Sequence, residues 1–151
     1  MMERQSVPSK LKPGLLKFRM PAEKQHLDMI RRTISHFIKE YGFSRSKVAG
    51  LEVSIVEHCE NIIKYGYAGK SGFIDVEVKA GLPKAAVTIK DTAPEFDMIK
   101  ARAELPQLAE RIKKGIGGKM GIRTILSMCD DVKYKRERGR NVNTFMINDG
   151  A

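Results

Sequence analysis

Hydrophobic residues recur along the chain with two different periods, and these periods predict both strands and helices. Residues 15–20 alternate apolar and basic side chains before a proline, which predicts a short edge strand. Apolar residues then recur at steps of three and four over residues 22–42 and again over residues 44–66. Ser44 can cap the second of these segments, and a glycine ends each one. The first part of the chain is therefore expected to be one strand followed by two amphipathic helices.

The second part of the chain returns to a period of two. Residues 74–80 and 85–91 alternate apolar and polar side chains and predict two strands joined by a turn at residues 81–84. Residues 92–118 show no sustained period, carry two prolines and end in glycines, with a modest helical run at residues 105–112. We interpret this long segment as a mobile lid. A helix at residues 121–129 and a hairpin of strands at residues 131–136 and 142–147 complete the prediction.

This order of elements predicts a two-layer α/β sandwich, of the α+β kind, with a mixed, mostly antiparallel sheet and helices on one face. The chain has 151 residues, which corresponds to one domain. We place a flexible lead-in at residues 1–13 and the domain at residues 14–148. No apolar run is long enough to span a bilayer, and the start lacks the apolar core of a signal peptide. The expected protein is soluble and cytoplasmic, without a membrane partner.

Charge and cysteine content narrow the candidate functions. The two cysteines, Cys59 and Cys129, form no metal-binding motif, and we favour two free thiols over a disulfide. The formal net charge is +10, and residues 111–140 contain ten basic and only three acidic side chains. Such a segment suits a phosphate group, an acidic protein or a nucleic acid, and a merely solvated basic face is as good an interpretation. A nucleic-acid partner ranks low, because aromatic residues are few and no known binding motif accompanies the charge.

Two polar residues on the second predicted helix are candidates for chemistry. Glu57 and Asn61 are four residues apart and therefore share one helix face, beside the apolar stripe. A carboxylate at this position can act as a general base, and an amide oxygen one turn away can bind Mg²⁺. Considered alone, they are more simply polar residues at the flank of a helix.

Asp91 is the second candidate, because the strand period places it on the same face as apolar residues. A buried carboxylate is costly without hydrogen bonds, and the amine of adenine is one donor that would satisfy it. A backbone amide in the following turn is the alternative. The glycines at positions 115, 117, 118 and 121 would let backbone amides approach phosphates where the next helix begins. The chain has no P-loop and no dinucleotide-binding fingerprint.

Three motifs together resemble the GHKL ATPases, in the form found in bacterial anti-sigma factors with serine-kinase activity. The run from Glu57 through Asn61 to Tyr67 is similar to their asparagine box, E-x-x-x-N followed by G-Y. Residues 90–97 resemble the box D-x-G-x-x-F-D, and residues 117–134 resemble the second glycine box with its helix and strand. The resemblance covers about residues 15–147 and implies the Bergerat ATP-binding fold, with a lid that closes over the nucleotide.

The resemblance also implies roles for single residues. Glu57 would be the general base that activates a serine hydroxyl, Asn61 would bind Mg²⁺, and Asp91 would bind the adenine amine. Gly118 and Gly121 would line the triphosphate. The positions implied for nucleotide binding are Asn61, Asp91, Ala93, Gly117, Gly118, Lys119, Gly121 and Thr144, with the hydroxyl of Thr144 supporting the adenine site and Lys119 available for a phosphate.

The function implied is that of an anti-sigma regulator. Such a protein binds ATP and Mg²⁺, phosphorylates a serine of a STAS-domain anti-anti-sigma protein, and otherwise sequesters a sigma factor, commonly as a homodimer. Ala93 stands at a glycine position of the aspartate box, and Lys119 lies inside the glycine box. These departures favour a second candidate, a catalytically silent partner-switching protein of the same fold. A nucleic-acid-binding protein is the third candidate.

Overall fold

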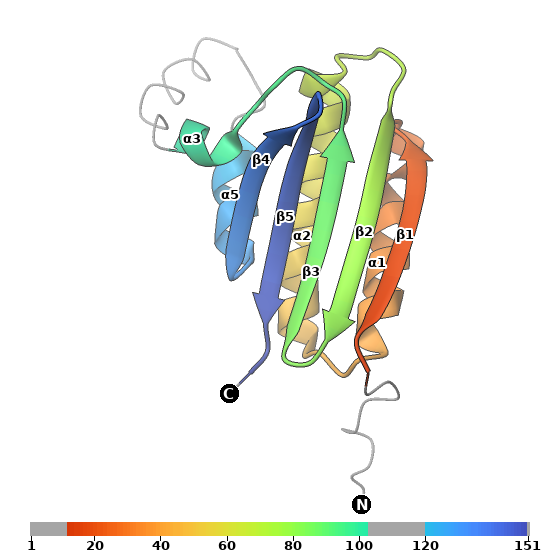
Figure 1. The fold of residues 1–151 in the computed structure, drawn as a ribbon, viewed down its shortest axis with the longest axis vertical. Helices are drawn as coiled ribbons and strands as arrows, with labels where there is room; N and C mark the ends of the chain where they lie inside the picture. Colours follow the sequence, from red (N-terminus) through yellow and green to blue (C-terminus); the bar gives the residue numbers. More distant parts are fainter. Residues whose placement is uncertain (1–11, 103–119, 151) are drawn as a thin grey trace, which may run out of the picture.

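A five-stranded antiparallel sheet forms one layer of the protein, and helices cover one of its faces (Figure 1). The structure is a computed structural model that describes residues 12–102 and 120–150. The strands lie in the order β1-β2-β3-β5-β4, and each pairing is antiparallel. Their bounds are β1 (Gly14–Pro21), β2 (Phe73–Gly81), β3 (Lys84–Asp91), β4 (Asp131–Glu137) and β5 (Arg140–Asn148). The predicted two-layer fold class is confirmed.

The helical layer consists mainly of three α-helices. They are α1 (Leu27–Lys39), α2 (Arg45–Asn61) and α5 (Met120–Met128), and a π-helical turn, Ile62–Gly66, extends α2. Ser44 caps α2 as predicted, since its hydroxyl accepts a hydrogen bond from the amide of Lys47 at 3.4 Å. The start predicted for the first helix, residue 22, is wrong. The amide of Ala22 donates to the carbonyl of Gly72 at 2.8 Å, which keeps the chain extended beyond β1.

The core lies between the sheet and these helices. Alternation along β2 and β3 puts Val78 opposite Val87 and Val76 opposite Ile89, all at most 2% exposed. Each such buried aliphatic side chain stabilises the fold by about 1.5–3 kcal/mol. The same alternation carries Asp91 onto the buried face, as the sequence predicted.

Helices α2 and α5 pack closely and run antiparallel. A Cβ atom at Gly50 would lie 2.6 Å from the carbonyl oxygen of Met128, so only glycine allows this approach. One turn further along α2, the hydroxyl of Ser54 donates to the carbonyl of Ile125 at 3.0 Å and accepts from the thiol of Cys129 at 3.2 Å. This alignment brings the amino end of α5 level with the last turn of α2. Both cysteines are free thiols, as favoured above.

Only the first part of the predicted lid, residues 92–102, falls within the described residues. It contains a short helix, α3 (Met98–Arg102), which the sequence did not predict. The side chain of Asp97 caps this helix by accepting from the amides of Ile99 and Lys100 at 3.0 and 3.1 Å. The remainder, including the helical run expected at residues 105–112, lies outside the described residues, so the lid stays a prediction. In the described ranges no helix has the length and apolar character needed to cross a bilayer.

Candidate functional site

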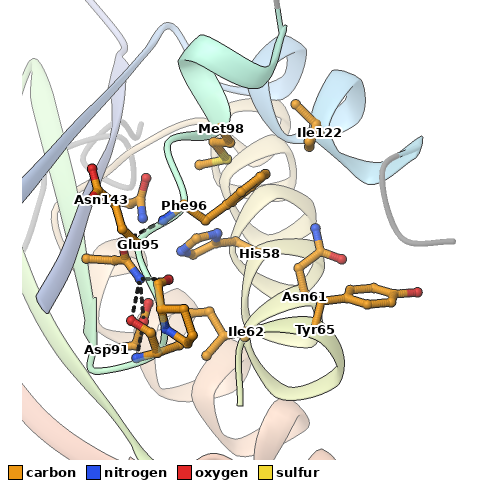
Figure 2. Close-up of a pocket in the computed structure, with 14 residues that line it drawn as sticks. His58, Asn61, Ile62, Tyr65, Asp91, Glu95, Phe96, Met98, Ile122 and Asn143 are labelled. Atoms are coloured by element: carbon orange, nitrogen blue, oxygen red, sulfur yellow. Dashed lines mark hydrogen bonds between the residues drawn. The ribbon is translucent and has the colours of Figure 1, made fainter. Parts of the chain in front are cut away.

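A pocket opens at one end of the sandwich, where the end of β3, the last turns of α2 and the beginning of α5 meet (Figure 2). It encloses about 230 Å³. Its helical wall includes Asn61 and Ile122, and its strand wall includes Asp91. The loop after β3 closes one side. The other lining residues are His58, Ile62, Tyr65, Gly66, Ala93, Pro94, Glu95, Phe96, Met98, Asn141 and Asn143.

Asp91 is 3% exposed, and only one of its carboxylate oxygens is engaged. Oδ1 accepts from the amide of Ala93 at 3.0 Å and from the side-chain amide of Asn141 at 2.9 Å. Among the described residues, none donates a hydrogen bond to Oδ2. Burial raises the pKa of Asp91, while the hydrogen bonds from Asn141 and Ala93 and the charge of Arg136 oppose that rise. Asp91 therefore offers a buried acceptor to a ligand in this pocket.

Asn141 holds the loop that follows Asp91. It lies directly across the ladder from Asp91 and is 4% exposed. Besides Asp91, its Nδ2 reaches the carbonyl oxygens of Ala93 at 3.2 Å and Pro94 at 3.0 Å. Its Oδ1 accepts from the amide of Phe96 at 3.1 Å and from the hydroxyl of Tyr134 at 2.7 Å. One buried side chain thus ties the carboxylate and its loop to β5.

Ala93 fits at the position where the aspartate box has glycine. No left-handed backbone is needed, because the non-glycine residues with positive φ in the described chain are Ala68 and Arg138. The methyl group of Ala93 packs against Gly66, where an added Cβ would lie 3.0 Å from it. The guanidinium of Arg136 donates to the carbonyl of Ala93 at 2.9 Å. The substitution is accommodated by a glycine on the facing helix.

The helical wall contains one of the two residues predicted for catalysis and metal binding. Asn61, the last residue of α2, lines the pocket immediately before the π-helical turn. Glu57 lies one turn earlier on α2, half-buried, and is not a lining residue. The described residues contain no cluster of three or more His, Cys, Asp or Glu side chains that could hold a metal ion. Any Mg²⁺ at Asn61 would therefore need further oxygen ligands from a nucleotide and water.

Two further polar residues line the pocket, and neither was predicted from the sequence. His58 is 7% exposed and Asn143 is 2% exposed. Within the part of the chain that the structure describes, neither His58 Nε2 nor Asn143 Oδ1 has a hydrogen-bond partner. Burial lowers the pKa of His58 to about 4, so its imidazole is neutral at physiological pH. For His58 a signal was present, since it falls on the apolar stripe of its predicted helix, between Ile55 and Ile62.

The structure does not bring all of the predicted residues to the pocket. Thr144 was expected to support the adenine site, but it does not line the pocket. It lies on the sheet face away from the helices, where its hydroxyl is 3.2 Å from that of Thr88. Its neighbour Asn143 lines the pocket instead. Gly121 lies in the first turn of α5, close in sequence to the lining residue Ile122. The predicted positions Gly117, Gly118 and Lys119 lie outside the described residues.

Comparisons with known proteins agree with this arrangement. Residues 20–147 match the family model of the histidine kinase-like ATPase domain. The serine-protein kinase RsbW of Listeria innocua is 25% identical over 126 residues, which cover 82% of this chain and 80% of that protein. RsbW of Bacillus licheniformis is 22% identical over 132 residues, covering 85% of this chain and 82% of that protein.

The fold agrees with a solved structure as well. The crystal structure of the RsbU and RsbW domains of a Mycobacterium tuberculosis protein superposes with a TM-score of 0.59 at 15% identity. The match covers 89% of this chain and 32% of that one. The resemblance to the GHKL ATPases and their anti-sigma kinases is confirmed, and the chain belongs to the family of histidine kinase-like ATPase domains.

Proposed function

We propose that this protein binds ATP with Mg²⁺ and phosphorylates a serine of a STAS-domain anti-anti-sigma protein, and that it otherwise sequesters a sigma factor. The observation that carries the proposal is one pocket with chemically different ends. Asp91, with an unengaged carboxylate oxygen, lies at the buried end. Asn61 and the beginning of α5 lie at the other. This polarity suits a nucleotide whose base is buried and whose phosphates face the helices.

The buried end fits adenine. Its exocyclic amine can donate to Asp91 Oδ2, while apolar atoms of Ile62 and Met98 contact the ring faces. Pockets that fix the orientation of a small ligand typically combine an apolar lining with a few polar groups. We assign no role in base binding to Thr144, which faces the opposite side of the sheet.

The helical end fits the phosphates and their metal ion. The first turn of an α-helix has backbone N–H groups that find no partner within the helix, and the nine-residue helix α5 can offer such groups to an anion. Asn61 offers an amide oxygen, and Mg²⁺ usually takes one or two protein ligands together with phosphate oxygens and water. When bound, Mg²⁺ neutralises charge that develops on the phosphates.

In the reaction proposed, the serine oxygen of the partner forms a bond to the γ-phosphorus and the bond from that phosphorus to the β,γ-bridging oxygen breaks. ADP leaves with the electron pair of the broken bond. The carboxylate of Glu57 takes the proton of the serine hydroxyl, as the family resemblance implies. The catalytically silent alternative remains the second candidate for one specific reason, which is that Glu57 does not line the described pocket.

Two measurements on the full chain test the proposal. Calorimetric titration with ADP and Mg²⁺ should show binding that Asp91→Asn reduces at least tenfold, because the amide presents donors where the amine needs acceptors. Thr144→Val is the matched control and should bind as wild type, since its hydroxyl lies on the other face of the sheet. Wild-type protein that binds no adenine nucleotide would refute the proposal.

The second measurement follows transfer of radiolabel from γ-labelled ATP to a purified STAS-domain anti-anti-sigma protein. Glu57→Gln should keep ADP affinity and lose transfer by a factor of 10² or more, the usual contribution of a general base. Glu60→Gln is the control on the same helix, where its carboxylate pairs with Lys64 at 3.7 Å. Nucleotide binding without any transfer by wild type would establish the silent alternative.

A further inference from the structure

Buried polar atoms without partners are rare in folded proteins, and each one calls for an explanation. Among the described residues, three buried side-chain atoms lack a hydrogen-bond partner, namely Ser35 Oγ, His58 Nε2 and Asn143 Oδ1. Two of the three line the same pocket as Asp91. Their side chains are more than nine-tenths buried. The unsatisfied hydrogen-bonding capacity of the core is therefore concentrated where a ligand would bind.

The two side chains come from opposite walls of the pocket. His58 reaches from α2 toward the strands, and Figure 2 shows its imidazole between Ile62 and Phe96, on the side of Asn143. Its ring also packs against Phe145, with the ring centroids 5.0 Å apart. Asn143 lies on β5, two residues beyond Asn141 and on the same face as Asp91 of the neighbouring strand. All three groups thus face the buried end of the pocket.

We propose that His58 and Asn143 read the nucleobase together with Asp91. His58 donates from Nε2–H to N1 or N7 of adenine, the ring nitrogens beside the amine. Asn143 Oδ1 accepts one proton of the exocyclic amine, and Asp91 Oδ2 accepts the other. This inference rests on the proposed function and assigns two residues that the family motifs do not include.

The chemistry of the base fits this donor and these acceptors. Adenine presents an amine donor beside a ring-nitrogen acceptor on both its N1 and its N7 edges. Guanine presents a carbonyl at the position of the amine, which would face the oxygens of Asp91 and Asn143 without a proton between them. The low pKa of His58 keeps the imidazole neutral, so one ring nitrogen carries a proton at pH 7 and no charge is buried with it.

Calorimetry with the full chain and three ligands, ADP, 1-deaza-ADP and 7-deaza-ADP, tests the proposal. Each deaza analogue replaces one ring nitrogen with a CH group. In wild type, one of the two analogues should bind about tenfold more weakly than ADP. His58→Leu keeps an apolar side chain against Phe145 but has no donor, and it should bind ADP about tenfold more weakly. The analogue and the variant each remove the same hydrogen bond. The analogue that binds wild type weakly should therefore bind the His58→Leu protein as tightly as ADP binds that protein.

Controls separate base reading from a general effect on the fold. Ser35→Ala removes the third unpartnered atom, which lies on α1 away from the pocket, and should leave ADP affinity unchanged. His58→Gln supplies an amide donor and should recover part of the affinity lost in His58→Leu. Asn143→Leu should weaken ADP binding but should leave the affinity for purine riboside diphosphate, which lacks the amine, within twofold of wild type.

Three results would overturn the inference. Wild type that binds both deaza analogues as tightly as ADP makes no hydrogen bond to N1 or N7, which removes the role proposed for His58. A folded His58→Leu protein that keeps wild-type affinity for ADP would show that His58 is not a donor to the base. Loss of affinity for ADP and for both analogues by equal factors in His58→Leu would assign the residue to packing alone. Failure of wild type to bind ADP at all would instead refute the proposed function.

Discussion

Asn141 is expected to be the most sensitive residue of the pocket to truncation. Asn141→Ala removes all five of its hydrogen-bond contacts at once, those of Nδ2 with three acceptors and those of Oδ1 with two donors. The groups left behind include the buried carboxylate of Asp91, the hydroxyl of Tyr134 and the amide of Phe96. Among the described residues, Asp91 then keeps one hydrogen bond, from the amide of Ala93, whereas the carbonyl of Ala93 keeps the bond from Arg136.

The cost follows from these contacts. A hydrogen bond between neutral groups contributes about 1 kcal/mol, and one to a charged group about 1.5–3 kcal/mol. The two protons on Nδ2 serve three acceptors, so four effective bonds are lost, one of them to a carboxylate. Water can reach the partly exposed side of the loop and recover some of this. We therefore expect Asn141→Ala to lower the free energy of unfolding by about 3 kcal/mol, which at about 2–4 °C per kcal/mol lowers Tm by about 6–12 °C.

Urea unfolding and thermal scans measure the change, with Asn148→Ala as the matched control. Asn148 is exposed at the end of the same strand, and its side chain accepts one hydrogen bond, from the amide of Gly150 at 2.9 Å. That substitution should cost less than about 1 kcal/mol. If Asn141→Ala were no more destabilising than Asn148→Ala, Asn141 would not hold the loop, and its contacts would have to be counted as energetically neutral.

Three other substitutions give separate expectations. Gly66→Ala should destabilise the protein and weaken ADP binding, because the new methyl group lies 3.0 Å from the methyl group of Ala93. Adding Ala93→Gly should restore both the stability and the affinity. A double mutant whose loss of stability equals the sum of the two single losses would contradict this. His58 has a pKa of about 4 in the folded protein and therefore binds a proton more weakly there than in the unfolded chain. Its contribution to the free energy of unfolding is fully present above pH 6.5 and falls by about 3 kcal/mol as the pH is lowered to 4. The difference between wild type and His58→Leu in urea titrations from pH 7 to pH 4 should show that slope, and parallel curves would exclude it. Ser54→Ala should cost about 1–2 kcal/mol through the lost bond to Ile125, without changing ADP affinity.

The sequence predicted most elements correctly because periods of two and 3.6 report which side of an element is buried. Asp91 shows the strength of this signal, since its place among apolar residues of a strand correctly indicated a buried carboxylate. Ser44 was predicted as a helix cap, and a hairpin was predicted with its turn at residues 138–141. The structure has that hairpin with a shorter turn, in which Arg138 and Gly139 have positive φ and Arg140 already belongs to β5. These features depend on local chemistry alone.

Features that depend on contacts between distant segments could not be predicted. The start of α1 is delayed because Ala22 pairs with Gly72, fifty residues away. The prediction of Thr144 rather than Asn143 as a pocket residue has a related cause. The alternating sets Val142, Thr144, Met146 and Asn143, Phe145, Ile147 each contain one polar and two apolar residues, so the pattern does not say which set faces the helices. Only pairing with β3, which puts Asn143 opposite Ile89, decides it.

Departures from the hydrophobic pattern are nonetheless the most informative part of this sequence. The described core contains six buried polar or charged residues, and four of them line the pocket. A fifth, Ser54, has a structural explanation in the docking of α5 on α2. Each buried polar residue lowers the stability of the fold unless it finds a hydrogen-bond partner. Asn141 offsets part of the cost of burying Asp91 by donating to its carboxylate. His58 and Asn143 have no such compensation within the described chain, and a bound nucleotide base that supplied it would stabilise the folded protein through the same two atoms that it contacts.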